Sequence, residues 1–245
     1  MTSCFPGMEY NIKGITYKVP EHLKFTDPQF MISQSVLDGL YDLLKIAIEI
    51  FNKNNIHYFA IDGTLLSVIR HQAFMPWDDD IDLGYFMEDH AKIKALKYKF
   101  IKKGYLFMDC QPGFVIQHPI HTRVAIDMHM VGLDYKDNKY KYCAPVIEGA
   151  PIFFIHKLFP KSVYFETEIK ELKEATICDL SVKIPKNADE VLKRCYADNV
   201  LNEVRGVVST KGHSLRKFQG LAYLYQKSLN NQIDFGSYII TNSFT

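Results

Sequence analysis

The chain has 245 residues, of which 47% are hydrophobic and 23% charged, the balance of an ordinary soluble globular protein. This length suits one domain, or one domain with an appended lobe, and it allows a sizeable core. Lys and Arg total 29 against 28 for Asp and Glu, so the near-zero net charge argues against a basic surface dedicated to nucleic-acid binding.

The cysteines and the N-terminus bear on the compartment. The five cysteines are widely spaced and form no Cys-x-x-Cys pair, which argues against a disulfide framework or a cysteine-based zinc site. The N-terminus lacks a charged start followed by an apolar run, and no stretch is long and apolar enough to span a bilayer. We therefore expect a cytoplasmic protein with reduced thiols and no transmembrane segment.

In chain order, the first 30 residues contain three prolines and little periodicity, which predicts an irregular extension. Apolar residues at helical spacing then predict a helix over residues 33–51, followed by a strand at 57–61, a short helix at 64–70, a strand at 80–85 and a helix at 88–103. Further strands are expected at 105–108, 114–117, 122–131 and 140–143, and further helices at 188–198 and 215–229. This order predicts an α+β fold, a mixed sheet with packed helices.

Two carboxylates in the strand at 80–85 are the most informative feature. Because side chains alternate along a strand, Asp80 and Asp82 share one face while Ile81 and Leu83 point to the core. Like charges held this close need a compensating cation. Hard cations such as Mg²⁺ prefer oxygen ligands and commonly bind through carboxylates and substrate phosphates.

A third carboxylate, Asp127, lies inside the apolar run Val-Ala-Ile-Asp-Met-His-Met, where burial without a partner is costly. An adjacent strand could bring it to Asp80 and Asp82, and three carboxylates could hold two metal ions for in-line phosphoryl displacement. The alternative is an acidic surface turn after a proline. Asp78 could be an accessory ligand, whereas Asp79 is expected to be structural.

The turn between the strand at 57–61 and the following helix suits a phosphate. Gly63 lets backbone approach a ligand closely, and Thr64 adds a hydroxyl at the helix start. Asp62 should turn away from a phosphate or cap the helix, and capping alone would also explain the turn. Arg70 and His71 either clamp a phosphate or orient the acidic loop, unless they form a solvated helix end.

Three other features are discounted as sites. Trp77 is expected first as a packing anchor and second as a stacking surface. His118, His121 and His129 lie near Asp127 in the sequence, but scattered strand histidines are usually satisfied structural residues. The lysines between positions 92 and 103 are expected on a solvated helix face.

The run IDGTLLSVIRHQAFMPWDDDIDLG, which ends at Gly84, resembles the signature of LicD-type phosphorylcholine transferases and fukutin-related proteins. That signature combines a Gly-Gly-Thr-Leu-Leu-Gly turn and helix, an Arg-His pair and Phe-Ile-Pro-Trp-Asp-Asp-Asp-Ile-Asp. A weaker similarity lies in residues 184–196, where family members have a proline, a short helix and Tyr-Gly. Here Asp62 and Ser67 replace two glycines of the first motif, and Ala197 replaces the last one.

We expect a core domain over residues 31–200 and a C-terminal helical extension over residues 201–245 packed on the same domain. The resemblance implies that the core is of the nucleotidyltransferase type, with a mixed sheet. It assigns Asp80, Asp82 and Asp127 to catalysis and to Mg²⁺ or Mn²⁺. It also assigns Gly63, Thr64, Arg70 and His71 to the nucleotide-diphospho donor.

The function implied by the resemblance is transfer of a phospho-alcohol, of the phosphocholine or sugar-alcohol phosphate type, from a CDP-linked donor to a glycan hydroxyl. The first alternative is transfer of a nucleoside monophosphate to a small molecule or protein, which would use the same acids. The second is a non-catalytic module that binds nucleotide or glycan.

Overall fold

The computed structural model describes residues 2–205 apart from 111–112, 120, 122, 148–149, 154–155 and 157–158. Its centre is a seven-stranded sheet with the order β14-β11-β10-β7-β6, and β9 and β8 continue from β10. These strands are β6 (Tyr58–Ala60), β7 (Asp80–Phe86), β8 (Leu106–Cys110), β9 (Gly113–Gln117), β10 (Ala125–Asp134), β11 (Lys139–Tyr142) and β14 (Val163–Tyr164). Only β7 and β10 run parallel within this sheet, so the predicted mixed sheet is confirmed.

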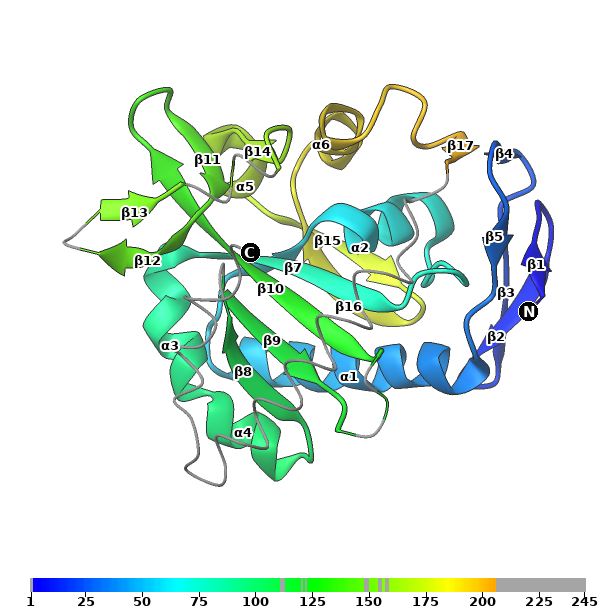
Figure 1. Ribbon diagram of the computed structural model, residues 1–245, viewed down its shortest axis with the longest axis horizontal. Helices are drawn as coiled ribbons and strands as arrows, with labels where there is room; N and C mark the ends of the chain where they lie inside the picture. The colour runs from blue at the N-terminus through cyan, green and yellow to red at the C-terminus, as the bar shows by residue number, and fades with distance from the viewer. Residues whose placement is uncertain are drawn as a thin grey trace, which may run out of the picture.

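The helices pack around this sheet (Figure 1), which confirms the α+β class. They are α1 (Gln34–Lys53), α2 (Asp62–Leu66), the π-helix η1 (Ser67–His71), the 3₁₀ turn η2 (Met87–Asp89), α3 (His90–Ala95), α4 (Lys97–Lys102), α5 (Glu166–Ile169) and α6 (Ala188–Cys195). The helix predicted at 88–103 is therefore divided at Leu96, and the one predicted at 188–198 ends at Cys195. The helix predicted at 215–229 lies outside the described residues, as does most of the extension predicted at 201–245.

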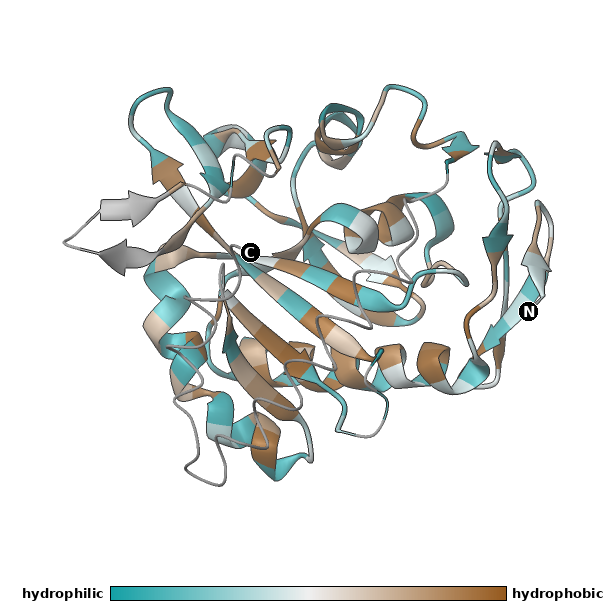
Figure 2. Ribbon diagram, viewed as in Figure 1, coloured by the Kyte–Doolittle hydropathy of each residue, from teal (hydrophilic) through white to brown (hydrophobic). Residues whose placement is uncertain are grey.

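Helix α1 forms one side of the core because its apolar residues recur every three or four positions. Leu37, Leu40, Leu43 and Leu44 are fully buried, and hydrophobic residues fill the central strands as well as patches of α1 (Figure 2). Gly39 lets the helix approach the sheet closely, since a Cβ there would lie 2.8 Å from Val124 Cγ2. Among the described residues, no helix has the length and apolar character needed to cross a membrane.

The N-terminal 30 residues are not irregular, so this prediction was wrong. They form β1 (Ser3–Cys4), β2 (Glu9–Ile12), β3 (Ile15–Lys18), β4 (Lys24–Phe25) and β5 (Gln29–Phe30). The β2–β3 hairpin turns at Lys13 and Gly14, both with positive φ, and the Tyr10 hydroxyl donates a hydrogen bond to the Phe74 carbonyl at 2.9 Å. Short strands of this kind leave too brief an alternation to detect from sequence.

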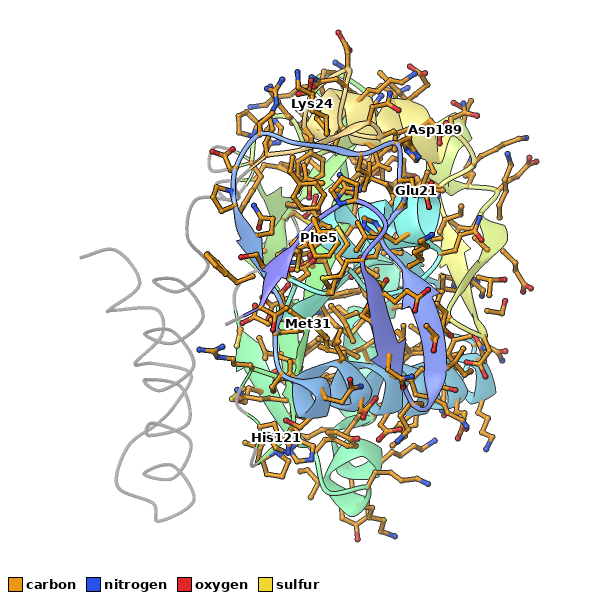
Figure 3. The ribbon with its side chains drawn as sticks, turned by 90° about the vertical axis from the view of Figure 1, so that its right-hand side faces the viewer. Phe5, Glu21, Lys24, Met31, His121 and Asp189 are labelled. Atoms are coloured by element: carbon orange, nitrogen blue, oxygen red, sulfur yellow. The ribbon has the colours of Figure 1, made fainter. Side chains whose placement is uncertain are left out.

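Three other short strand pairs lie outside the central sheet. Strands β15 (Lys173–Ile177) and β16 (Leu180–Ile184) form a hairpin, and β12 (Ala144–Ile147) pairs with β13 (Ala150–Ile152). Strand β17 (Glu203–Val204) lies parallel to β4, so the end of the described chain meets the N-terminal region (Figures 1 and 3). Lys24 of β4 and Asp189 of α6 lie at the same end of the molecule in Figure 3.

Candidate functional site

The parallel pairing of β7 and β10 brings the predicted acids together. Its register sets Asp127 opposite Asp82 and Ala125 opposite Asp80. Since alternate side chains share a face, the carboxyls of Asp80, Asp82 and Asp127 lie on one side of the sheet. Their apolar neighbours Ile81 and Ile126 are fully buried on the other side.

The acidic residues form two groups that could each hold a cation. One ligand atom from each of Asp82, Asp127 and His129 lies within 4.8 Å of the others, and the same holds for Asp78, Asp79 and Asp80. His129, which the sequence had not favoured, is two positions after Asp127 and therefore faces the same way. Asp79, which we expected outside the metal shell, belongs to the second group.

The remaining histidines of that part of the sequence lie elsewhere. The His118 and His121 rings are 4.9 Å apart, and the His121 amide donates to His118 Nδ1 at 3.0 Å. In the described part of the chain neither belongs to an acidic group. The structural role expected of these two residues stays a prediction, whereas His129 lies with its Nε2 3.9 Å from Asp82 Oδ1.

Burial and mutual repulsion make this cluster costly without a cation. Burial first, and then neighbouring carboxylates, raise the pKa of Asp80 and of Asp82 well above the usual range, and the pKa of Asp78 to about 7. Asp127 Oδ1 is buried and has no hydrogen-bond partner among the described residues. An oxygen-rich set with an unsatisfied carboxylate oxygen fits a hard divalent cation such as Mg²⁺ or Mn²⁺.

Gly63 gives the carboxylates room. A Cβ at this position would lie 2.7 Å from Asp78 Oδ2 and 3.4 Å from Asp82 Oδ2, so glycine permits both acids to approach the turn. Thr64 is buried beside it, and its hydroxyl oxygen accepts a hydrogen bond from the Asp82 amide at 2.8 Å. Thr64 therefore fixes α2 against β7, the strand that carries Asp80 and Asp82.

Asp62 bonds a tyrosine through its side chain, and the expectation that it turns away from a phosphate stays a prediction. Its backbone has φ +43, in the left-handed region that favours glycine, and it stands where the family motif has a glycine. The Tyr142 hydroxyl donates a hydrogen bond to Asp62 Oδ2 at 2.6 Å, and the Tyr164 hydroxyl lies 3.2 Å from that of Tyr142. Burial raises the pKa of the Asp62 carboxyl. The two tyrosines were not anticipated from the sequence.

Arg70 and His71 are the last two residues of η1, and Arg70 Nε donates a hydrogen bond to His71 Nδ1 at 3.4 Å. Arg70 donates hydrogen bonds from Nη1 to the Val200 carbonyl at 2.9 Å and to the Glu203 carbonyl at 3.1 Å. His71 is buried with its ring 5.3 Å from that of Trp77, and burial lowers its pKa well below the usual range, so the ring is neutral. Trp77 also packs edge-on to Phe25, as expected of a packing anchor.

A cavity of about 380 Å³ opens in front of the acids, within the size range of small-molecule sites. Its lining includes Asp78, Asp80, Asp82 and Gly63. The other lining residues are Gln29, Leu66, Arg70, Met75, Trp77, Tyr196, Ala197, Asn199, Val200, Glu203, Val204 and Arg205.

The sequence did not predict most of the residues that line the cavity after position 195. The one available signal was Tyr196, near the end of the helix predicted at 188–198, because it occupies the place of the tyrosine in the family's Tyr-Gly. Burial, and the charges of Asp62, Asp82 and Asp78, raise the pKa of its hydroxyl, which is consistent with a position beside the acids.

Comparison with known proteins identifies the central part of the chain. A family model described as "LicD/FKTN/FKRP, nucleotidyltransferase domain" matches residues 55–187, which is more than half of the chain. The match contains all the predicted site residues and stops short of the cavity residues at positions 196–205.

Similar full-length proteins were found in bacteria and mammals. Uncharacterized protein RP689 of Rickettsia prowazekii (strain Madrid E) is 26% identical over 73% of this chain and 62% of its own length. The human protein named ribitol 5-phosphate transferase FKRP is 30% identical over 25% of this chain and 12% of its own length. The Haemophilus influenzae lipopolysaccharide cholinephosphotransferase LicD is 31% identical over 26% of this chain and 22% of its own length. The chain thus spans less than two thirds of each relative.

Proposed function

Because this chain belongs to the LicD/FKTN/FKRP nucleotidyltransferase-domain family, we propose that it is a phosphotransferase that depends on a divalent cation. Its proposed reaction moves a phospho-alcohol, of the phosphocholine or sugar-alcohol phosphate type, from a CDP-linked donor to a glycan hydroxyl. Two relatives support this class, since one is named a ribitol 5-phosphate transferase and the other a cholinephosphotransferase.

The observation that carries the proposal is the register of β7 and β10. It aligns Asp82 with Asp127 beside Asp80, at the edge of a cavity large enough for part of a nucleotide conjugate. Asp82, Asp127 and Asp80 would hold Mg²⁺ or Mn²⁺, which supplies charge neutralisation at the donor phosphates when bound. Gly63 leaves the space that this arrangement needs.

In the proposed reaction the acceptor hydroxyl oxygen forms a bond to the phosphorus that carries the alcohol. The bond between that phosphorus and the bridging oxygen breaks, and cytidine monophosphate leaves with the bridging oxygen. A carboxylate of the cluster takes the hydroxyl proton as general base. The geometry required is the in-line arrangement described for phosphoryl transfer.

The family description also names a nucleotidyltransferase domain, which favours one second candidate, transfer of a nucleoside monophosphate from a triphosphate. The two reactions differ in which half of the donor reaches the acceptor. Incubation with donors labelled on the base or on the alcohol therefore separates them, because phospho-alcohol transfer leaves the base in solution.

The first experiment is a thermal-shift titration with CDP and with CDP-linked alcohols, in millimolar Mg²⁺ or Mn²⁺ and in excess chelator. A ligand that binds the folded state raises its stability by about 2.7 kcal/mol at one hundred times its Kd. We expect the shift only with the cation, because the acids repel an anionic donor. Equal shifts in chelator would contradict cation dependence.

The second experiment replaces Asp82 or Asp127 with Asn, which removes a charge and preserves side-chain size. Each variant should lose at least about 10²–10³-fold in turnover while its melting temperature changes little or rises without metal. The matched control is Asp189→Asn, an exposed acid on α6 (Figure 3). Near-normal turnover in Asp82→Asn or Asp127→Asn would overturn the proposed metal site.

A further inference from the structure

One side of the cavity is formed by residues 196–205, hereafter the wall segment. It follows α6, lies outside the family match and lines the cavity together with the acids. It contacts the N-terminal region through β4 and residues beside it: the Lys24 amide donates to the Asn202 carbonyl and the Thr26 amide to the Val204 carbonyl, both at 2.9 Å, and His22 Nε2 lies 3.4 Å from the Leu201 carbonyl oxygen. These contacts leave its cavity side to be held by something else.

That side is held by Arg70, which lies 130 positions earlier in the chain than Val200. Arg70 Nη1 bonds two wall carbonyls, Nη2 contacts Met75 Sδ at 3.0 Å, and Nε donates to His71 Nδ1 at 3.4 Å. A guanidinium has five N–H donors, so four of them are engaged. Bidentate recognition of a phosphate needs two parallel N–H groups, and this arrangement leaves only one.

Hydrogen bonds within the wall segment do not replace this attachment. Arg205 Nη2 donates to Asn199 Oδ1 and to Glu203 Oε2, each at 3.2 Å, and these bonds tie the segment to itself. The segment contains only the two-residue strand β17 as regular structure. Among the described residues, the hydrogen bonds from Arg70 thus link the wall segment to the part of the domain that carries the acids.

We propose that Arg70 is a positioning residue that fixes the wall segment across the cavity from the carboxylates, and not a phosphate ligand. The position of the wall segment then determines how tightly a nucleotide fits between this segment and Asp82. The second statement rests on the proposed function, whereas the first concerns the unliganded protein alone. The expectation from the sequence that Arg70 binds the donor directly is thereby replaced.

The test compares Arg70→Lys and Arg70→Met in the full chain by hydrogen exchange of the ligand-free protein. A hydrogen bond to a charged group typically changes the equilibrium constant for local opening by a factor of about ten to one hundred. Loss of these bonds should therefore make amides in the wall segment exchange at least about tenfold faster. Amides of β7 and β10 should keep their rates. Unchanged exchange in the wall segment of both variants would overturn the positioning role, whatever the protein binds.

A binding measurement with CDP and Mg²⁺ separates positioning from direct phosphate contact. Lysine keeps the charge and binds phosphate well, but it cannot bridge two carbonyls, a sulfur and a ring nitrogen. Under our proposal Arg70→Lys loses about tenfold in CDP affinity or more, together with faster wall exchange. Retained CDP affinity despite faster exchange overturns the claim that the wall sets nucleotide fit. Lost affinity with unchanged exchange supports a phosphate ligand instead.

Thr26→Val tests the same proposal without disturbing the core, should both Arg70 variants fail to fold. The Thr26 hydroxyl donates to the Val204 carbonyl at 3.1 Å, so its loss loosens the wall segment from its outer side. The matched control is Thr16→Val, another exposed threonine, on β3. Faster wall exchange and weaker CDP binding in Thr26→Val alone support the proposal. Faster exchange without weaker binding, or no change in exchange, overturns it.

Discussion

We expect the hydrogen bond between Tyr142 and Asp62 to be needed for stability only because residue 62 is an aspartate where the family motif has glycine. A buried carboxyl that loses its donor destabilises the folded state by about 1–3 kcal/mol, so Tyr142→Phe should lower the free energy of unfolding by this amount. For a domain of about 150–250 residues, each 1 kcal/mol shifts Tm by roughly 2–4 °C. The expected decrease in Tm is therefore about 2–12 °C.

Asp62→Gly should change stability far less. Removing the side chain relieves the left-handed conformation at φ +43, worth about 1–2 kcal/mol, and this is partly offset by the added flexibility of glycine, about 0.5–1 kcal/mol. The Tyr142 hydroxyl keeps its partner in Tyr164, 3.2 Å away. In the Asp62→Gly background Tyr142→Phe should consequently cost less than about 1 kcal/mol.

The double-mutant cycle is measured by urea or thermal unfolding of the four proteins, with exposed Tyr135→Phe as the control. We expect a coupling energy of about 1–2 kcal/mol between positions 62 and 142. Additivity within about 0.5 kcal/mol would refute the reasoning, because it would mean that the tyrosine contributes independently of the aspartate.

Two further predictions concern the acids. Without metal, stability should fall as pH rises from about 4 through about 7. The pKa values of Asp78, Asp80 and Asp82 are raised in the folded protein, which therefore keeps protons that these carboxyls release in the unfolded chain above about pH 4. Tm measured across this range in chelator should show the decline and millimolar Mg²⁺ should remove most of it; a flat Tm in chelator would count against close packing of the acids. Gly63→Ala places a Cβ 2.7 Å from Asp78 Oδ2. It should weaken Mg²⁺-dependent CDP binding at least about tenfold with a smaller effect on Tm, and unchanged binding would show that the turn tolerates a side chain.

The acids on β7 were predictable because strand alternation is local. Asp80 and Asp82 need only the residues between them to be placed on one face, and the apolar run around Asp127 marked a second buried strand. That an adjacent strand would bring Asp127 to Asp80 and Asp82 was a hypothesis; the parallel pairing, with Asp127 opposite Asp82, was found only in the structure.

Features that depend on distant contacts were not predictable. The partners of Arg70 are backbone carbonyls at positions 200 and 203, and a carbonyl has no sequence signature. The N-terminal strands have only two to four residues each, so their alternation is too short to recognise. Tyr142 is one of many strand tyrosines, and only the fold reveals that its hydroxyl reaches Asp62.

The parallel pairing of β7 and β10 also bears on the order of folding events. Asp82 and Asp127 are about 45 positions apart in the chain, so a long loop must close before they become neighbours. Closure brings two anionic side chains together at the same step, and their repulsion opposes it. We therefore expect the site to form late in folding, through a non-local contact, and a divalent cation present during refolding should speed the step that forms it.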